Sequence, residues 1–347
     1  MKIGLRSAYS QRNGYGKDGV GLARAILDRG HDLRTAPTMV DVPIPKDIAM
    51  LFTLPYDYPL DLAIYHVEPQ SVQLSEPNSH IARKNICWTM IGWDSIEHAR
   101  FRDDFAERIK RFDHLVVYDP SSLEAVSGYF PSERTHMVMG GYEADAWSLP
   151  TEPVERPQVY TFGMLGLLGP RKGPMSAILG FMRCREKYGD DFQAQLVLRT
   201  NFPFIPEGTK LPEGVYVEVG YWNPKQVQHF YWSIDTFLAP SSAEGKNLPP
   251  MEALASGTNV ILSDLPSHKM WCDPSMATFV ETQRAEIAAN HEGLMVHPEV
   301  MAEAMWDDYT NEAKYRLRAF QAAQRLPAQM DWSKCLERLS LTLNLGL

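Results

Sequence analysis

Short apolar runs that suit buried strands alternate with helical patterns along most of this 347-residue chain, and this alternation restricts the fold more than any other feature. One series fills the first half, and a second series begins near residue 160. Strands that alternate with helices form parallel sheets with helices on both faces. The chain also exceeds the roughly 250–300 residues at which a single core stops growing. We therefore expect an α/β protein with two doubly wound, Rossmann-like domains.

The predicted elements and domain limits follow from this pattern. Strands are expected at 3–7, 48–52, 60–65, 84–90, 114–118 and 135–139, and then at 160–164, 194–199, 215–219, 236–239, 260–262 and 278–280. Helices are expected at 19–29, 103–111, 173–188, 224–232, 251–256 and 298–324. A proline-rich stretch at 148–158 suggests a boundary, which gives domains at 1–152 and 153–328. A tail helix in 329–347 either completes the second domain or packs on the first.

Composition excludes several classes of protein. The net charge of −9 argues against broad binding to nucleic acid or anionic membranes. Four widely spaced cysteines indicate free thiols in a reducing compartment and give no zinc pattern. The N-terminus runs directly into a strand, without a signal peptide, and no apolar stretch approaches the ~20 residues of a membrane span. We expect a cytoplasmic protein.

The segment PSSAEGKNLPPMEALASG, residues 240–257, contains two acids, Glu244 and Glu252. The first follows a predicted strand, and the second lies in the first turn of the predicted next helix. Ligands bind at this edge of an open α/β sheet. Free backbone N–H groups there suit a phosphate, and carboxylates suit sugar hydroxyls. The pattern predicts a site for a phosphate-bearing sugar, against the alternative that Glu252 only stabilises a helix N-terminus while Glu244 is solvated.

A second segment, GMLGLLGPRKG at 163–173, joins another predicted strand to a helix. Arg171 and Lys172 lie at the N-terminus of that helix, where the helix dipole disfavours cations. An anion between them would explain this placement. The alternative is a solvated basic turn. The spacing does not match a P-loop.

Two further groups in the first half are weaker candidates. GYGKDG, with Gly14 and Gly16, matches G-x-G-x-x-G, but it lies too far from the preceding strand for a nicotinamide dinucleotide site. We interpret it as a loop that precedes a helix at 19–29 and faces a cleft between the domains. His66, Trp88 and Asp94 lie at or just after strand ends and could form an acceptor site. The alternatives are a buried core histidine and packing of the tryptophan between domains.

With these motifs, the chain resembles the retaining nucleotide-sugar glycosyltransferases of the GT-B fold, in the large family 4 group. The resemblance covers almost the whole length and is strongest in 240–257, which is similar to the signature PS-x-x-E-G-x-G-x-P-x-x-E-A-x-A-x-G. It implies two Rossmann-like domains across a cleft, with the tail helix crossing back to the first. It also implies a nucleoside diphosphate sugar as donor, retention of the anomeric configuration, and no required cofactor or metal.

The resemblance also implies roles for single residues. Glu244 would contact the donor sugar and the transition state, Glu252 the ribose, and Lys172 the diphosphate. The backbone N–H groups expected to line the sugar and diphosphate are those of Gly245, Lys246, Asn247 and Leu248, with Gly14 and Gly16 across the cleft.

The chain departs from the family pattern at three places. Lys246 and Asn247 replace an aromatic residue and a glycine. The arginine that usually precedes the diphosphate lysine is absent, and Arg171 or Arg199 would substitute for it. Trp88 stands near the position of a first-domain histidine.

Three other functions stay open at this point. One is a GT-B-shaped nucleotide-binding protein without transfer activity, which the departures at Lys246 and Asn247 and the missing arginine favour. Another is a sugar-nucleotide epimerase of the same fold, and the third is a dinucleotide oxidoreductase. The acceptor of a transferase could be a glycan, a lipid, a protein or a modified nucleobase, and peripheral membrane contact is compatible with the sequence.

Overall fold

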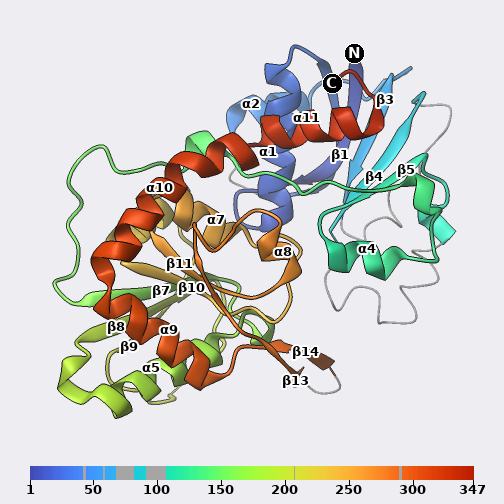
Figure 1. The fold of residues 1–347 in the computed structure, drawn as a ribbon. Helices are drawn as coiled ribbons and strands as arrows, with labels where there is room; N and C mark the ends of the chain where they lie inside the picture. The colour runs from blue at the N-terminus through green and yellow to red at the C-terminus, as the bar shows by residue number, and fades with distance from the viewer. Residues whose placement is uncertain (42–43, 58, 68–81, 91–106, 207, 289–290) are drawn as a thin grey trace. The chain divides into compact units, whose positions relative to one another are not determined.

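The computed structural model describes residues 1–347 except 42–43, 58, 68–81, 91–106, 207 and 289–290 (Figure 1). The chain forms two compact units. Unit 1 comprises Met1–Glu143 and Gln329–Leu347, and unit 2 comprises Ala144–Ala328. The sequence predicts domains at 1–152 and 153–328 and a tail at 329–347. That these segments fold as separate domains stays a prediction.

Unit 1 contains a parallel sheet whose described strands run in the order β2-β1-β3-β4-β5-β6. The strands are β1 (Lys2–Tyr9), β2 (Asp32–Val40), β3 (Leu62–His66), β4 (Asn85–Thr89), β5 (His114–Val117) and β6 (Thr135–Met137). Its described helices are α1 (Gly14–Asp28), α2 (Lys46–Leu51), α4 (Pro120–Val126) and α11 (Trp332–Leu343). Every residue of β3 and β4 is buried, as expected for central strands of a parallel sheet covered on both faces.

Two sequence predictions in unit 1 are wrong, and one strand was missed. Residues 48–51 belong to helix α2 instead of a strand, because Ile48 and Leu51, one helical turn apart, are the residues that face the core. Strand β2 was missed, since its charged and half-exposed residues do not form an apolar run. The glycine segment 14–18 forms the first turns of α1, since the Asn13 side chain accepts a hydrogen bond from the Gly16 N–H at 2.7 Å.

The helix predicted at 103–111 lies mostly outside the described residues.

Unit 2 contains a second parallel sheet, in the order β12-β11-β10-β7-β8-β9, and all six strands predicted for it are confirmed. They are β7 (Tyr160–Gly166), β8 (Ala194–Thr200), β9 (Val215–Val219), β10 (Thr236–Ala239), β11 (Asn259–Ser263) and β12 (Thr278–Val280). Its described α-helices are α5 (Pro174–Tyr188), α6 (Pro224–Ser233), α7 (Leu248–Ala255), α8 (Pro266–Lys269), α9 (Pro298–Thr310) and α10 (Glu312–Met330). A hairpin of β13 (Gln283–Ala288) and β14 (His291–Met295) was not predicted, since no turn motif interrupts that stretch.

Helices cover both faces of this second sheet (Figure 1). Helices α5 and α9 share one core with β7 and β8, in which Phe181 and Met301 are fully buried. Helix α6 packs on the other face, where a Cβ at Gly163 of β7 would meet Phe230 and Ile234. The expected architecture of two doubly wound α/β units is therefore confirmed. No helix in the described part of the chain has the length and apolarity needed to cross a membrane.

Candidate functional site

The strand order of unit 2 reverses between β7 and β10. From β7 the chain proceeds outward through β8 and β9, then returns to place β10, β11 and β12 on the other side of β7. Loops at the carboxyl ends of two such strands diverge and leave a crevice, the usual ligand site of open α/β sheets. The two loops here are 167–173 and 240–247, which carry the two motifs singled out in the sequence.

Backbone contacts hold these loops together. Gly173 has a left-handed φ of 66°, and a Cβ there would lie 2.2 Å from the carbonyl oxygen of Pro240. The backbone carbonyl of Arg171 accepts hydrogen bonds from the Ser242 N–H at 2.8 Å and the Ser242 hydroxyl at 3.0 Å. Only glycine permits this close approach without strain, so Gly173 allows the loops 167–173 and 240–247 to stay in contact.

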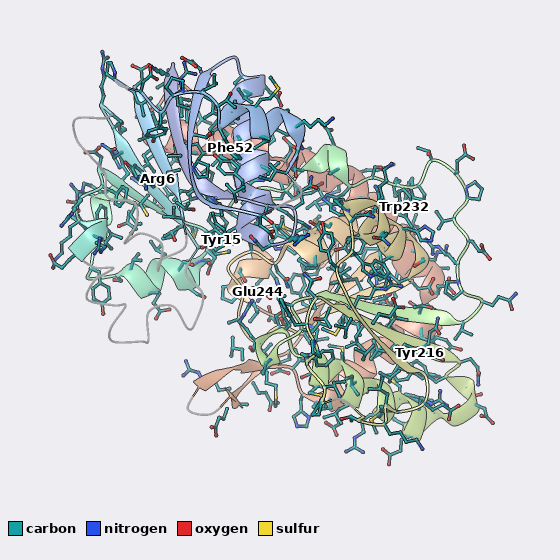
Figure 2. All side chains as sticks on the ribbon, turned by 180° about the vertical axis from the view of Figure 1, so that it is seen from behind. Arg6, Tyr15, Phe52, Tyr216, Trp232 and Glu244 are labelled. Carbon is teal, nitrogen blue, oxygen red and sulfur yellow. The ribbon has the colours of Figure 1, made fainter. Side chains whose placement is uncertain are left out.

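Three of the predicted residues meet where the loops touch, since Glu244, labelled in Figure 2, pairs with both Arg171 and Lys172. The Glu244 side chain is 6% exposed; its Oε2 lies 2.8 Å from Nη1 of Arg171 and its Oε1 lies 2.5 Å from Nζ of Lys172. Burial alone would raise the pKa of Glu244, but the two cations outweigh it and lower that pKa to about 2. In this structure the Glu244 carboxylate lies between Arg171 and Lys172, so the solvated alternative for Glu244 is wrong. A phosphate bound to the two cations stays a prediction.

Asn247 extends this cluster. It adopts a left-handed φ of 70° immediately before helix α7, and its Oδ1 accepts a hydrogen bond from Lys172 Nζ at 2.9 Å. Its Nδ2 lies 3.0 Å from Nε2 of His268, a fully buried residue of α8. Sequence reasoning missed His268. The available signal was a histidine in the turn after strand 260–262, which ends at the same sheet edge as 236–239.

Other residues of the 240–257 segment are placed around this cluster. Lys246 is buried, and its carbonyl accepts a hydrogen bond from Nε1 of Trp271 at 3.2 Å. Gly245 is also buried, and Leu248 is the first residue of α7. Glu252 therefore lies in the second turn of the helix, not in the first as predicted, because the helix begins earlier than residue 251. Its buried carboxylate accepts a hydrogen bond from the Tyr231 hydroxyl at 3.0 Å.

Arg199 points to a different set of partners. Its Nη2 lies 3.1 Å from Oε1 of Glu218, and its guanidinium lies 3.0 Å from the ring centroid of Trp222. Burial lowers the pKa of Arg199 to about 10. Of the two arginines expected to substitute for the missing one, Arg171 is the one that contacts Glu244. A donor contact by Arg199 stays a prediction.

The candidates in unit 1 are mostly buried. His66 is fully buried at the end of β3, with Nδ1 3.0 Å from the Ser7 hydroxyl and Nε2 2.6 Å from the Tyr118 hydroxyl. Trp88 is also fully buried, and its indole N–H donates to the carbonyl of Val138 at 2.9 Å. Its ring could stack on a sugar only after rearrangement of the surrounding core.

The remaining predicted site residues of unit 1 are Gly14, Gly16 and Asp94. Gly14 and Gly16 belong to α1, and Gly16 packs so closely that a Cβ would lie 2.4 Å from Cβ of Ser10. Asp94 lies outside the described residues. In the described part of the chain, no three His, Cys, Asp or Glu side chains gather in a way that could hold a metal ion.

Comparisons with known proteins identify the architecture. No protein-family model and no curated protein sequence matches the chain. Among solved structures, Anabaena HepE in complex with UDP and glucose is similar over 100% of both chains, with 14% identity and a TM-score of 0.71. Sucrose-phosphate synthase from Thermosynechococcus elongatus is similar over 99% of both chains, again with 14% identity and a TM-score of 0.71. The catalytic domain of Arabidopsis thaliana starch synthase IV, bound to ADP and acarbose, covers 100% of this chain with 12% identity and a TM-score of 0.65.

These neighbours share the GT-B architecture of two Rossmann-like domains, and the chain has this fold. At 12–14% identity, the similarity establishes the fold alone.

Proposed function

We propose that this protein is a glycosyltransferase that moves a sugar from a nucleoside diphosphate sugar to an acceptor. The observation that carries the proposal is the cluster of Glu244, Arg171 and Lys172, with a buried Glu244 carboxylate, at the edge of the unit 2 sheet where the strand order reverses. A buried carboxylate that pairs two cations at a ligand-binding edge suits a substrate with both phosphates and hydroxyls. HepE and starch synthase IV, which share the fold, were crystallised with UDP and with ADP, and this supports a nucleotide-sugar donor.

The reaction requires stabilisation of a departing diphosphate. Arg171 and Lys172 provide fixed positive charge for it, and the backbone N–H groups of 245–248 would add hydrogen bonds. Binding of the diphosphate would take over the two cations and leave Glu244 to accept hydrogen bonds from the sugar. Glu252, buried one turn further along α7, would bind the ribose.

We further propose retention of configuration without a required metal ion. With the positive charge supplied by side chains, no metal is needed to neutralise the leaving group. The acceptor would attack from the face that the diphosphate leaves, and the departing phosphate oxygen would take the acceptor proton. In this scheme Glu244 accepts hydrogen bonds from sugar hydroxyls and forms no covalent bond with the sugar.

Donor binding is the first test. UDP-, GDP- and ADP-sugars would be screened by the shift in unfolding temperature, with wild type, Lys172→Ala and Lys225→Ala. Lys225 is an exposed lysine of α6 and controls for the loss of one charge. We expect at least one sugar nucleotide to stabilise wild type and Lys225→Ala but not Lys172→Ala. Stabilisation by none of them, or equal stabilisation of all three proteins, contradicts the proposal.

Turnover separates the enzyme from its alternatives. With the donor identified, hydrolysis or transfer that is present in wild type and absent in Glu244→Ala excludes a binding protein without activity. Release of free sugar or of a glycoside, instead of a second sugar nucleotide, excludes an epimerase. Analysis of the anomer formed decides whether configuration is retained.

A further inference from the structure

The side-chain amide of Asn247 lies between a cation and an imidazole. Lys172 Nζ donates a hydrogen bond to Oδ1 at 2.9 Å, and Nδ2 faces Nε2 of His268 at 3.0 Å. An ammonium group can only donate, so Oδ1 must face Lys172 and the amide NH₂ must face His268. The amide therefore has one orientation that satisfies both neighbours.

His268 is fixed from its other side. Its Nδ1 lies 2.8 Å from the backbone carbonyl of Ser263, which can only accept, so the Nδ1 atom carries a proton. The Nε2 atom is then free to accept the hydrogen bond from Asn247 when the imidazole is neutral. Burial lowers the pKa of His268, and this favours the neutral ring.

Charged groups around His268 shift its pKa in both directions. Glu244 and Asp264 favour its protonated form, whereas Lys172 disfavours it. A protonated ring would present an N–H to Asn247, which would have to turn its NH₂ toward the Lys172 ammonium. In that arrangement Oδ1 accepts from the ring, but the NH₂ faces the ammonium donor against donor, which would displace Lys172.

The backbone of Asn247 shows that this link has a cost. A left-handed φ of 70° is unfavourable by about 1 kcal/mol for a residue other than glycine. Glycine would adopt this conformation freely but would have no amide to join Lys172 to His268. The side chain therefore has a reason to be present at a position where the backbone alone favours glycine.

We propose that His268 is a positioning residue that acts through Asn247 to hold the Lys172 ammonium at the anion-binding position of unit 2. The identification of that anion as the diphosphate of a sugar donor rests on the proposed function. His268 touches no reacting atom in this scheme. It sets the direction of one amide, and that amide sets the position of the cation.

Two substitutions of similar size separate this role from simple packing. The carboxamide of His268→Gln reaches the place of Nε2 and keeps an acceptor for Asn247. The carboxamide of His268→Asn reaches only the place of Nδ1, so it keeps the bond to Ser263 and loses the acceptor. Calorimetry with UDP should give affinity within about threefold of wild type for His268→Gln and a loss of about tenfold for His268→Asn.

Asn247→Gly tests whether His268 acts through Asn247. In that background His268→Asn should change UDP affinity by less than about twofold, because the link is already absent. Equal affinities for His268→Gln and His268→Asn, or effects of His268→Asn and Asn247→Gly that simply add, would overturn the proposal.

A measurement that needs no nucleotide distinguishes failure of the His268 proposal from failure of the proposed function. In protein with ¹⁵N-labelled histidine, wild-type His268 should show the neutral Nδ1-protonated tautomer. Lys172→Ala and Asn247→Gly should each shift its Nε2 resonance, whereas Lys225→Ala should not. If none of UDP, GDP and ADP binds wild type while these shifts occur, the proposed function is wrong and the link stands. If UDP binds and no shift occurs, or if the ring is Nε2-protonated, the link is wrong.

Discussion

At the scale of single residues, the central feature is that Glu244 pairs with the two cations that we assign to the donor diphosphate. The carboxylate and the diphosphate therefore compete for Arg171 and Lys172. We predict that Glu244→Gln binds UDP about fivefold more tightly than wild type, a gain of about 1 kcal/mol, because the competing charge is removed. Calorimetric titration measures this directly. The same variant should lose transfer, since a neutral amide accepts fewer hydrogen bonds from a sugar.

A matched acid in the same unit controls for the change in net charge. Glu213→Gln breaks the ion pair with Arg185, outside the Glu244 cluster, and should leave UDP affinity unchanged. A Glu244→Gln variant that binds UDP more weakly than Glu213→Gln would show that Glu244 supports diphosphate binding instead of opposing it.

At the scale of elements, the turn between β7 and α5 positions both cations. Any side chain at Gly173 meets the Pro240 carbonyl oxygen and must also adopt a φ of 66°. We predict that Gly173→Ala lowers the free energy of unfolding by about 2 kcal/mol or more and weakens UDP binding, because the turn moves away from loop 240–247. Urea unfolding and calorimetry measure the two effects.

The same turn contains its own control. Gly169 has a φ of −77°, and a Cβ there would meet no atom within 4 Å. Gly169→Ala should be neutral or slightly stabilising, since alanine restricts the unfolded chain. Equal behaviour of the two variants would mean that close approach at Gly173 does not hold the site.

The elements also show what the sequence could and could not predict. The six strands of unit 2 were predictable because each is a short apolar run between turn residues, and the two motifs follow from their place after β7 and β10. Helix α2 and strand β2 could not be predicted, because few of their residues face the core. With so few apolar positions, tertiary contacts determine whether the segment forms a strand or a helix.

In the site, the sequence placed the motifs with Glu244 and with Arg171 and Lys172 each after a strand, but it could not show that these three side chains pair with one another. The ion pairs depend on a turn closed by Gly173 over Pro240. His268 comes from helix α8, and its contact with Asn247 depends on a side-chain orientation that no spacing encodes.

At the scale of the whole molecule, the two ends of the chain are joined in unit 1. Helix α11 packs on α1 so closely that a Cβ at Gly21 would lie 2.2 Å from Cδ1 of Trp332. Arg29 binds the carbonyls of Ser333 and Leu347, each at 2.9 Å. The tail is therefore part of the core of unit 1.

We predict that Trp332→Ala destabilises unit 1 by about 3–5 kcal/mol, because it leaves a large cavity beside α1. Leu341→Ala, at a position of the same helix that is 71% exposed, should change stability by less than about 0.5 kcal/mol. Hydrogen exchange would locate the effect. Loss of protection in β1 and β3 with unit 2 unaffected is expected, whereas equal loss in both units would contradict a role confined to unit 1.

A second property of the whole fold is the dependence of its stability on pH, and in unit 2 this centres on Asp308. This buried carboxylate of α9 accepts hydrogen bonds from Tyr160 at 2.8 Å, from Thr236, and from Asn259 at 2.6 Å. These three residues begin β7, β10 and β11, so Asp308 joins the strands at the edge opposite the candidate site. Burial raises the pKa of Asp308 to about 6, although the hydroxyl groups of Thr236 and Tyr160 oppose that shift.

The sign of the pH effect follows from this raised pKa. Between the ordinary value of 3.8 and about 6, the folded state holds a proton that the unfolded chain releases. The free energy of unfolding must therefore fall as pH rises through this interval, by roughly 3 kcal/mol for this group, and then change no further. Urea unfolding of wild type and Asp308→Asn at several pH values between 4 and 7 isolates the contribution, because other groups titrate in both proteins. The difference in stability should shift in favour of Asp308→Asn as pH rises to 6, and parallel curves would mean that Asp308 is ionised throughout.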